Sequence, residues 1–231
     1  MRMLAKDVWQ LSSFFQNWFN VYLVEDVLID AATRWSKRRI LTQLQGRSVR
    51  LLALTHCHPD HQGAAAAVCE QLGVPLACPE DDVPAMEGRA PMLPQNLAIR
   101  LGVKMWGGPK RHVDWTLRQG DSIGGFRVIH APGHTPGHSI FFRAADGVAI
   151  VGDVLANMSY VTGREVLREP PALFTTNVEE NRCSIRLLAD LKPHVICFGH
   201  GPPLRNPELL EILVSKQSQR ILKVTPQLQH G

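Results

Sequence analysis

The sequence predicts an α/β fold, in which strands and helices alternate along the chain. In the first half, short apolar runs typical of strands alternate with amphipathic stretches typical of helices, giving two successive strand–helix–strand units. The second half adds a run of strands, a helix, a strand and a final helix. No polar, low-complexity or Pro/Gly-rich linker divides the 231 residues, so we expect one domain over residues 1–231.

The first half begins with a predicted β-hairpin. Two apolar runs flank the polar pair Glu25-Asp26, which is typical of a turn between paired strands. The helix that follows offers Trp35, Ile40 and Leu44 for a buried face. The elements expected here are strands over 21–24 and 27–29, a helix over 33–44, a strand over 49–54, a helix over 62–72 and a strand over 74–78.

Residues 79–119 show a weaker pattern, because prolines and glycines interrupt any long element there. We therefore expect an irregular stretch that shapes a substrate pocket. Farther on, Asn177 followed by Glu180 resembles a capping box, and Asn206-Pro207 is a favourable helix start. The expected elements are strands over 126–130, 139–143 and 148–151, a helix over 177–191, a strand over 195–198, a helix over 206–217 and a loose tail after Thr225.

Four potential metal ligands lie within six residues that directly follow a predicted strand. In extended backbone His56 and His58 point to the same side and can bind one metal. Asp60 and His61 follow a proline turn and can reach a second metal nearby. Imidazole and carboxylate ligands suit zinc, iron or manganese. A surface histidine cluster satisfied by hydrogen bonds is the alternative, but so dense a group of ligands favours metal binding.

Three more potential ligands follow predicted strands. His134 lies in a Pro/Gly-rich loop, Asp153 follows an apolar strand where its carboxylate could bridge two cations, and His200 follows another strand and a glycine. Each alone could be a polar strand terminus, but together with the first motif they indicate a dinuclear site. We expect His138 not to bind metal but to support a ligand from behind, or simply to be satisfied at the start of a strand, and we expect His130 to be structural.

Composition excludes several classes of protein. The formal net charge is +4 with scattered basic residues, so nucleic-acid binding receives little support. No apolar run reaches membrane-spanning length, and residues 1–10 lack the features of a secretion signal. Five cysteines without regular spacing argue against a disulfide framework and for a reducing compartment, so we expect a cytoplasmic protein without a membrane partner.

This chain resembles the metallo-β-lactamase superfamily in four motifs that follow the family's order: His56-Cys57-His58-Pro59-Asp60-His61, Pro132-Gly133-His134-Thr135, Gly152-Asp153 and Gly199-His200. The resemblance extends from Asp30 to His200. It implies an αββα four-layer sandwich of two mixed β-sheets flanked by helices, with the metals at one sheet edge. It also implies two divalent metal ions, for which we expect zinc, with iron or manganese as alternatives.

The resemblance also implies a ligand set. His56, His58 and His134 would hold the first metal. Asp60, His61 and His200 would hold the second, and Asp153 would bridge the two. Asp30 matches a position that supports the ligand loop from behind, although Ala31-Ala32 stand where a glycine often follows in the family.

These implied ligands predict a metallo-hydrolase that cleaves an ester, thioester or lactone of a small molecule by attack of metal-bound hydroxide. Asp60 could also pass a proton to the leaving group, so Asp60 and Asp153 are the predicted catalytic residues. Within the superfamily, the resemblance leaves two branches open, the glyoxalase II-like and the lactonase-like enzymes. Lactonases of this family carry a tyrosine where Ala156 stands, with Tyr160 displaced from that position.

Other functions stay open. Persulfide dioxygenases resemble this pattern, including the cysteine at Cys57, but use one iron at the positions of His56, His134 and Asp153. A phosphodiesterase or nuclease of the same fold is a further alternative. A non-catalytic binding protein with a relic site is the least favoured, because the ligand set is intact.

The predicted substrate pocket draws on residues 79–112 and 155–174, the two irregular stretches beside the ligand loops. The residues named for it are Met158, Tyr160, Arg164 and Phe174. The expected partner is a small-molecule substrate. The oligomeric state is left open, and a homodimer is one option.

Overall fold

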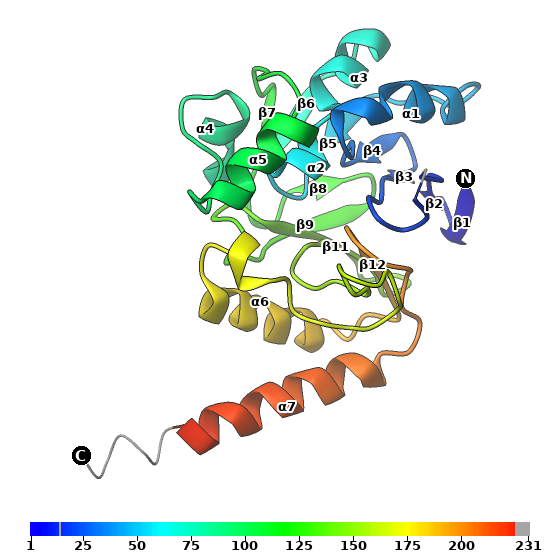
Figure 1. The fold of residues 1–231 in the computed structure, drawn as a ribbon. Coiled ribbons are helices and arrows are strands. Elements are labelled where there is room, and N and C mark those ends of the chain that lie inside the picture. The colour runs from blue at the N-terminus through cyan, green and yellow to red at the C-terminus, as the bar shows by residue number, and fades with distance from the viewer. Residues whose placement is uncertain (14, 225–231) are drawn as a thin grey trace.

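The computed structural model describes residues 1–13 and 15–224, which form two β-sheets packed face to face with helices on both outer sides (Figure 1). One sheet contains seven strands. Neighbouring strands are antiparallel from the first to the fourth and parallel from the fourth to the seventh. Its strands are, in order, β1 (Arg2–Ala5), β2 (Val8–Gln10), β3 (Tyr22–Val24), β4 (Val27–Ile29), β5 (Leu51–Ala53), β6 (Leu76–Pro79) and β7 (Trp115–Leu117).

The second sheet contains five strands and is also mixed. Its strands β8 to β11 are antiparallel neighbours, and β12 pairs with β11 in parallel. In spatial order the strands are β12 (Val195–Phe198), β11 (Val148–Gly152), β10 (Ser139–Arg143), β9 (Phe126–His130) and β8 (Ser122–Ile123).

Alternating side chains divide the apolar core into three layers. In β3, Tyr22 and Val24 join the core between the sheets, whereas Leu23 packs on the outer side. Helices α1 (Lys37–Gln43) and α3 (Ala65–Leu72) cover the seven-stranded sheet, and α6 (Val178–Asp190) and α7 (Glu208–Val224) lie on the opposite side of the molecule (Figure 1). The expected αββα sandwich of two mixed sheets flanked by helices is therefore confirmed.

Most predicted elements are present with shifted ends. The hairpin, the strands of the second half and the helix capped by Asn177 agree with expectation, and the Asn177 side chain accepts a hydrogen bond from the Glu180 N–H. The helix expected over 62–72 is divided into α2 (Pro59–Gln62) and α3. Gly63 and Ala64 lie between them, and Gly63 allows a close approach to residues 33 and 34, where an added Cβ would lie 2.6 Å from Thr33 C. The tail after Thr225 lies outside the described residues.

The expectation of an irregular stretch over 79–119 was wrong. The segment contains the 3-10 turn η2 (Glu80–Asp82), α4 (Val83–Met86), α5 (Leu97–Trp106) and β7. Pro84 lies in the first turn of α4, where its missing N–H costs no helical hydrogen bond. Asn96 caps α5 by accepting a hydrogen bond of 3.0 Å from the Ile99 N–H.

Trp35 was wrongly expected on a buried helix face. Residues Arg34–Ser36 form the short 3-10 turn η1 ahead of α1, and this turn directs Trp35 outward with 76% of its surface exposed. The remaining 3-10 turn, η3 (Ala172–Phe174), precedes α6. Among the described residues, no helix combines the length and apolar character needed to cross a membrane.

Candidate metal centre

The predicted ligands come from loops that follow strands of both sheets. Strand β5 leads into the loop that carries residues 55–61, and β9, β11 and β12 lead toward His134, Asp153 and His200. The two sheets lie face to face, so the ends of these strands meet at one edge of the sandwich. The structure brings all seven predicted ligands together there.

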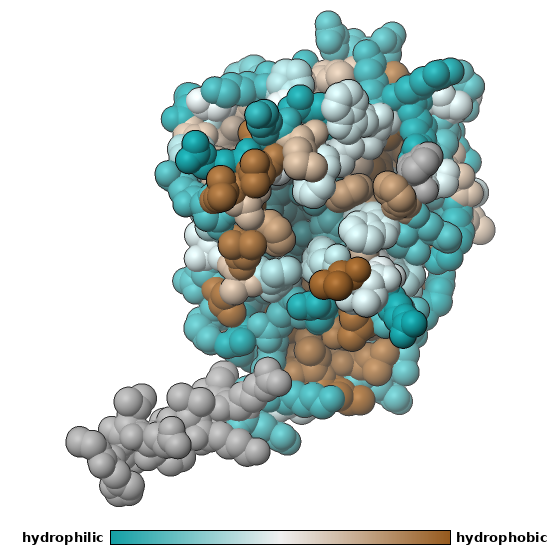
Figure 2. Space-filling view, in the orientation of Figure 1, coloured by the Kyte–Doolittle hydropathy of each residue, from teal (hydrophilic) through white to brown (hydrophobic). Residues whose placement is uncertain are grey.

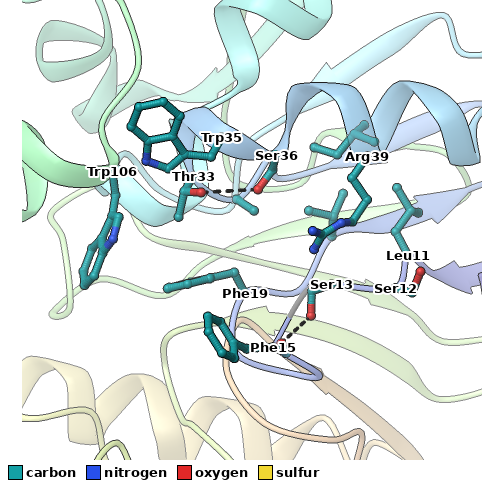
Figure 3. Close-up of a pocket in the computed structure, with 13 residues that line it drawn as sticks. Leu11, Ser12, Ser13, Phe15, Phe19, Thr33, Trp35, Ser36, Arg39 and Trp106 are labelled. Carbon is teal, nitrogen blue, oxygen red and sulfur yellow. Dashed lines mark hydrogen bonds between the residues drawn. The ribbon is translucent and has the colours of Figure 1, made fainter.

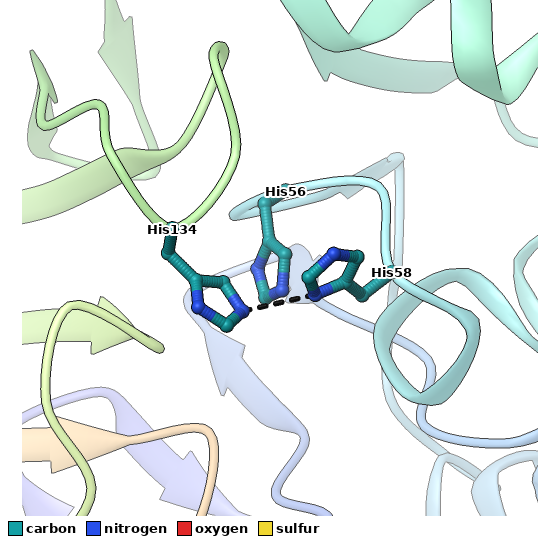
Figure 4. A group of neighbouring side chains, drawn as sticks. All are labelled: His56, His58 and His134. Atoms are coloured by element: carbon teal, nitrogen blue, oxygen red, sulfur yellow. Dashed lines mark hydrogen bonds between the residues drawn. The ribbon is translucent and has the colours of Figure 1, made fainter. Parts of the chain in front are cut away.

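The first group contains three histidines whose rings converge (Figure 4). One ring nitrogen from each of His56, His58 and His134 lies within 4.8 Å of the others. His58 Nδ1 and His134 Nε2 are 2.9 Å apart. All three side chains are buried, so a cation among them would be shielded from bulk solvent.

The second group contains Asp60, His61 and His200, whose ligand atoms also lie within 4.8 Å of one another. His200 Nε2 is 3.3 Å from Asp60 Oδ2. This group is formed partly by α2, because Asp60 and His61 occupy its first turn after Pro59.

Asp153 lies between the two groups. Its Oδ2 is 3.6 Å from His134 Nε2 of the first group and 3.1 Å from His200 Nε2 of the second. Its Oδ1 is 3.4 Å from His61 Nε2. A carboxylate in this position can contact cations bound to either group.

These distances fit metal coordination. Ligand atoms bound at about 2.0–2.2 Å in a tetrahedral site lie roughly 3.3–3.6 Å from one another, and the separations of 3.1, 3.4 and 3.6 Å around Asp153 are close to that range. Among the described residues, buried atoms without a hydrogen-bond partner include His56 Nε2, His61 Nε2 and Asp153 Oδ1. Such atoms are costly to bury unpaired, and all three face the places where cations would be bound.

Each of the five predicted ligand histidines contacts a protein group outside the site through the ring nitrogen that points away from the ligand groups. His58 Nε2 donates to the Leu93 carbonyl at 2.6 Å, and His200 Nδ1 donates to the Trp18 carbonyl. The remaining contacts are His56 Nδ1 with Thr55 Oγ1, His61 Nδ1 with Asp30 Oδ2 and His134 Nδ1 with Thr175 Oγ1. Contacts of this kind fix the tautomer and leave the inward nitrogen free to bind metal.

Asp30 lies beneath the ligand loop and contacts it through both carboxylate oxygens. Its Oδ1 accepts a hydrogen bond of 2.8 Å from the Thr55 N–H, and its Oδ2 accepts one of 2.9 Å from Thr55 Oγ1. The same Oδ2 lies 2.9 Å from His61 Nδ1. Asp30 therefore contacts both ends of the segment that carries the first motif.

His138 contacts the ligands without joining either group. Its Nε2 accepts a hydrogen bond of 3.0 Å from the Asp153 N–H, and its ring lies 4.9 Å from the ring of His56. This placement is compatible with the supporting role expected for it. His130 lies farther out and donates through Nε2 to the Pro136 carbonyl.

The electrostatics favour the ligand forms of His56, His134 and Asp60. Burial and the neighbouring imidazoles hold the pKa of His56 well below its ordinary value, and burial with His58 does the same for the pKa of His134. Neutral imidazole is the form that binds metal. Burial raises the pKa of Asp60, but contacts with His200 and His61 outweigh it and lower that pKa to about 2. At His61 and His200 burial lowers the pKa, but the nearby carboxylates outweigh it and raise the pKa, to about 10 for His200. A bound cation would therefore displace a proton from these two rings.

Two glycines allow the strand ends to approach the site. A Cβ on Gly199 would collide with the Asp153 carboxylate and lie 2.6 Å from His61 Cε1. Gly152 has a positive φ of 48°, and a Cβ there would lie 2.7 Å from both His138 Nε2 and Thr55 Oγ1. Glycine therefore precedes both Asp153 and His200 because no larger residue fits.

Sequence reasoning missed Asp82, which connects two ligand loops. This buried carboxylate accepts hydrogen bonds from the Cys57 N–H at 2.7 Å, Thr135 Oγ1 at 2.8 Å and the Gly137 N–H at 2.9 Å. Burial raises its pKa, although all three hydrogen bonds act in the opposite direction. The available signal was an acidic residue shortly after strand β6, beside the strand that carries the first motif.

A cavity of 540 Å³ opens onto the two groups, and a hollow is visible near the centre of the face in Figure 2. Tyr160 and Phe174, two of the residues named for the substrate pocket, line this cavity. Met158 and Arg164 do not, and their predicted substrate contacts gain no support. Met158 is buried, and Arg164 is exposed in a turn closed by its carbonyl and the Ser159 N–H.

Sequence reasoning did not anticipate the wall formed by residues 15–19. Phe15, Trp18 and Phe19 line the cavity together with Ile99 and Trp106 of α5. The Phe19 ring lies 5.7 Å from the ring of His200, so this wall reaches the second ligand group.

Comparison with known proteins agrees with the resemblance found in the motifs. Residues 20–200 match the family model described as the Metallo-beta-lactamase superfamily. The Bacillus subtilis protein YobT is 34% identical to this chain over 218 residues, covering 87% of this chain and 91% of the relative.

Two further comparisons bear on the reaction and the metal. The hydroxyacylglutathione hydrolase GloC of Haemophilus influenzae is 35% identical over 115 residues, covering 47% of this chain and 50% of GloC. The crystal structure of TTHA1623 in a di-iron-bound form superimposes with a TM-score of 0.64 at 30% identity, covering 85% of this chain and 93% of that protein.

Proposed function

Because the chain belongs to the metallo-beta-lactamase superfamily, we propose that it is a dinuclear metal-dependent hydrolase that cleaves an ester, thioester or lactone of a small molecule. We propose zinc as the metal, since imidazole and carboxylate ligands suit it. The di-iron form of TTHA1623 makes iron the first alternative to test.

The observation that carries this proposal is the position of Asp153 between two complete ligand groups. Its Oδ2 faces both His134 and His200, while its Oδ1 faces His61. A mononuclear enzyme would not need Asp60, His61 and His200 to form a second group beside the first. The geometry therefore favours two metals over the single iron of the persulfide dioxygenase alternative.

Two bound cations would supply Lewis acidity, both to lower the pKa of a water and to stabilise negative charge that develops on a substrate carbonyl. The protein contributes a buried, preorganised set of ligands whose orientations are fixed by Asp30, Leu93 and Trp18. Contacts that are already in place need little reorganisation during the reaction.

Asp60 is the proposed proton carrier. It is the most exposed of the ligands, with 17% of its side chain exposed, and it lines the cavity into which a substrate would enter. A carboxylate there can take a proton from water and give it to the departing oxygen or sulfur. The name of GloC, a hydroxyacylglutathione hydrolase, supports transfer of an acyl group to water as the reaction class.

Metal analysis of purified protein, combined with a substrate panel of lactones, thioesters, phosphodiesters and glutathione persulfide, tests the proposal. We expect two zinc ions per chain and turnover of an ester, thioester or lactone. His61→Ala should reduce the metal content to one ion or fewer, whereas His112→Ala, at an 81% exposed side chain, should retain two. One iron per chain with oxygen consumption would contradict the proposal. Turnover of phosphodiesters alone would contradict ester or thioester cleavage and favour the phosphodiesterase alternative.

A further inference from the structure

We propose that the acyl part of the substrate is an uncharged hydrocarbon or aromatic group larger than acetyl, bound in the 540 Å³ cavity that opens onto the metal ligands. This inference rests on the proposed ester or thioester hydrolysis and specifies its substrate class. In the reaction the acyl carbon–oxygen or carbon–sulfur bond breaks, water supplies the new oxygen, and the leaving group takes the proton.

The walls of the cavity are apolar and come from three separate segments. Residues 15–19 supply aromatic side chains, residues 160–174 supply Tyr160 and Phe174, and α5 forms the third wall. Along α5 the lining residues Ala98, Gly102 and Trp106 are four positions apart, which places them on one face of the helix. The cavity is within the size range of pockets that bind small organic ligands.

The charges of the cavity are confined to its floor. All the charged or titratable lining residues are predicted metal ligands, apart from the phenol of Tyr160, whose pKa is raised by burial so that it stays neutral. The part of the chain that the structure describes places no lysine or arginine in this lining. Arg168 lies 5.8 Å above the Tyr160 ring, outside the cavity wall.

An anionic acyl group would therefore be disfavoured. Its charge would lose hydration on entry and would find no cationic side chain on the walls in return. A hydrocarbon or aromatic group would instead be favoured by these apolar walls. Each methylene that leaves water adds about 0.8 kcal/mol of binding free energy, which corresponds to about a fourfold increase in binding affinity or in kcat/KM.

The aromatic wall also connects this cavity to the metal centre. Phe19 packs with its ring 5.7 Å from the ring of Trp106 and 5.7 Å from that of His200. An acyl group seated against Phe19 and Trp106 would therefore place its carbonyl toward His200 and Asp60, which lie at the floor.

A neighbouring pocket of 290 Å³ provides a matched control (Figure 3). Trp106, Phe15 and Phe19 line both hollows, whereas Trp35 lines only the neighbouring one. Trp35 and Trp106 therefore allow the same substitution to be compared inside and outside the metal cavity.

The experiment is a chain-length series of thioesters with a common thiol, from acetyl to octanoyl, together with an anionic succinyl member, assayed with the metal-loaded enzyme. We expect kcat/KM to rise about fourfold for each added methylene until the cavity is filled. Trp106→Ala should reduce the octanoyl-to-acetyl ratio at least tenfold, while Trp35→Ala leaves it unchanged. A flat series, or preference for the succinyl thioester, would overturn the inference without affecting the proposed hydrolysis.

A second variant guards against misfolding of Trp106→Ala. A Cβ on Gly102 would lie 3.6 Å from Pro59 Cγ and 3.9 Å from Trp106 Cε3, in ordinary contact. Gly102→Leu should therefore favour the helix while extending a side chain into the cavity. We expect unchanged thermal unfolding, with the octanoyl-to-acetyl ratio of kcat/KM reduced at least tenfold.

Calorimetry separates this inference from the proposed function. Octanamide, an uncharged compound of the same chain length, should bind the metal-loaded protein at least tenfold more tightly than acetamide, and Gly102→Leu should remove that difference. If no thioester is hydrolysed but octanamide binds in this way, the proposed hydrolysis fails and the apolar site stands. If octanamide and acetamide bind equally, the apolar site fails.

Discussion

The carboxylate of Asp82 accepts a hydrogen bond of 2.7 Å from the backbone N–H of Cys57, the residue between the first two predicted ligands. The same carboxylate accepts hydrogen bonds from Thr135 and Gly137, in the loop that carries His134. One buried side chain therefore fixes the relative position of the two loops that supply the first ligand group.

Asp82→Asn should weaken this connection. The amide introduced by the substitution would place an N–H against groups that are themselves donors, so we expect the free energy of unfolding to fall by about 2–3 kcal/mol. Because support of this kind orients the ligands, zinc affinity should also fall roughly 10- to 100-fold. Urea unfolding and zinc titration measure the two effects.

Asp81→Asn is the matched control for that variant. Asp81 is the neighbouring residue in the same turn, but its side chain is 59% exposed. We expect this control to keep both stability and zinc affinity. Equal losses in the two variants would remove the role assigned to Asp82.

Removing metal should destabilise the fold. The inward nitrogens of His56 and His61 are buried without hydrogen-bond partners, so bound cations would satisfy them. With free zinc at about a thousand times its dissociation constant, mass action adds roughly 4 kcal/mol to the free energy of unfolding. Thermal unfolding before and after treatment with a chelator, and again after zinc is restored, checks this expectation. Identical curves would argue against metal binding at these histidines.

Asp60→Asn should retain both metals but lose turnover. Asparagine keeps an oxygen that can face the metal, yet it cannot carry the proton that the carboxylate would transfer. We expect kcat to fall by about 10²–10⁴-fold, the range typical of general acid–base catalysis. Metal content must be measured in the same samples. Unchanged kcat with two metals bound would exclude the proton role.

Glu87 should make the free energy of unfolding depend on pH in the acidic range. Its carboxylate contacts the backbone N–H of Val113 and the side chains of Arg89 and His112. These contacts lower its pKa to about 2. The folded state thus favours the ionised form, which contributes stability above the unfolded pKa of about 4.3 and loses that contribution as pH falls toward about 2. The difference in urea midpoint between the wild type and Glu87→Gln should be largest near pH 6 and shrink at pH 3. A difference independent of pH would contradict this account.

The strands and capped helices that the sequence predicted depend on local patterns. Asn177 caps α6 through a contact three residues along the chain, and the alternation in Tyr22–Val24 directs successive side chains to opposite faces. Residues 79–119 were misjudged because Pro84 was counted as a breaker when it lies in the first turn of a helix. A proline has opposite effects at the start and in the middle of a helix, and sequence alone did not show which applied.

The sequence by itself predicted which side chains gather in the candidate metal centre, because all seven lie in short motifs that follow predicted strands and match the family's motifs in order. Only the tertiary structure decided that Asp82 connects two loops and that α5 forms an apolar wall of the cavity, and only it gave the distances from Asp153 to the two groups. Those relationships join residues distant in the chain, and the packing of the two sheets sets the distances between them. Spacing along the chain therefore specifies the chemistry of the site, whereas packing specifies the shape and polarity of the space that a substrate would occupy.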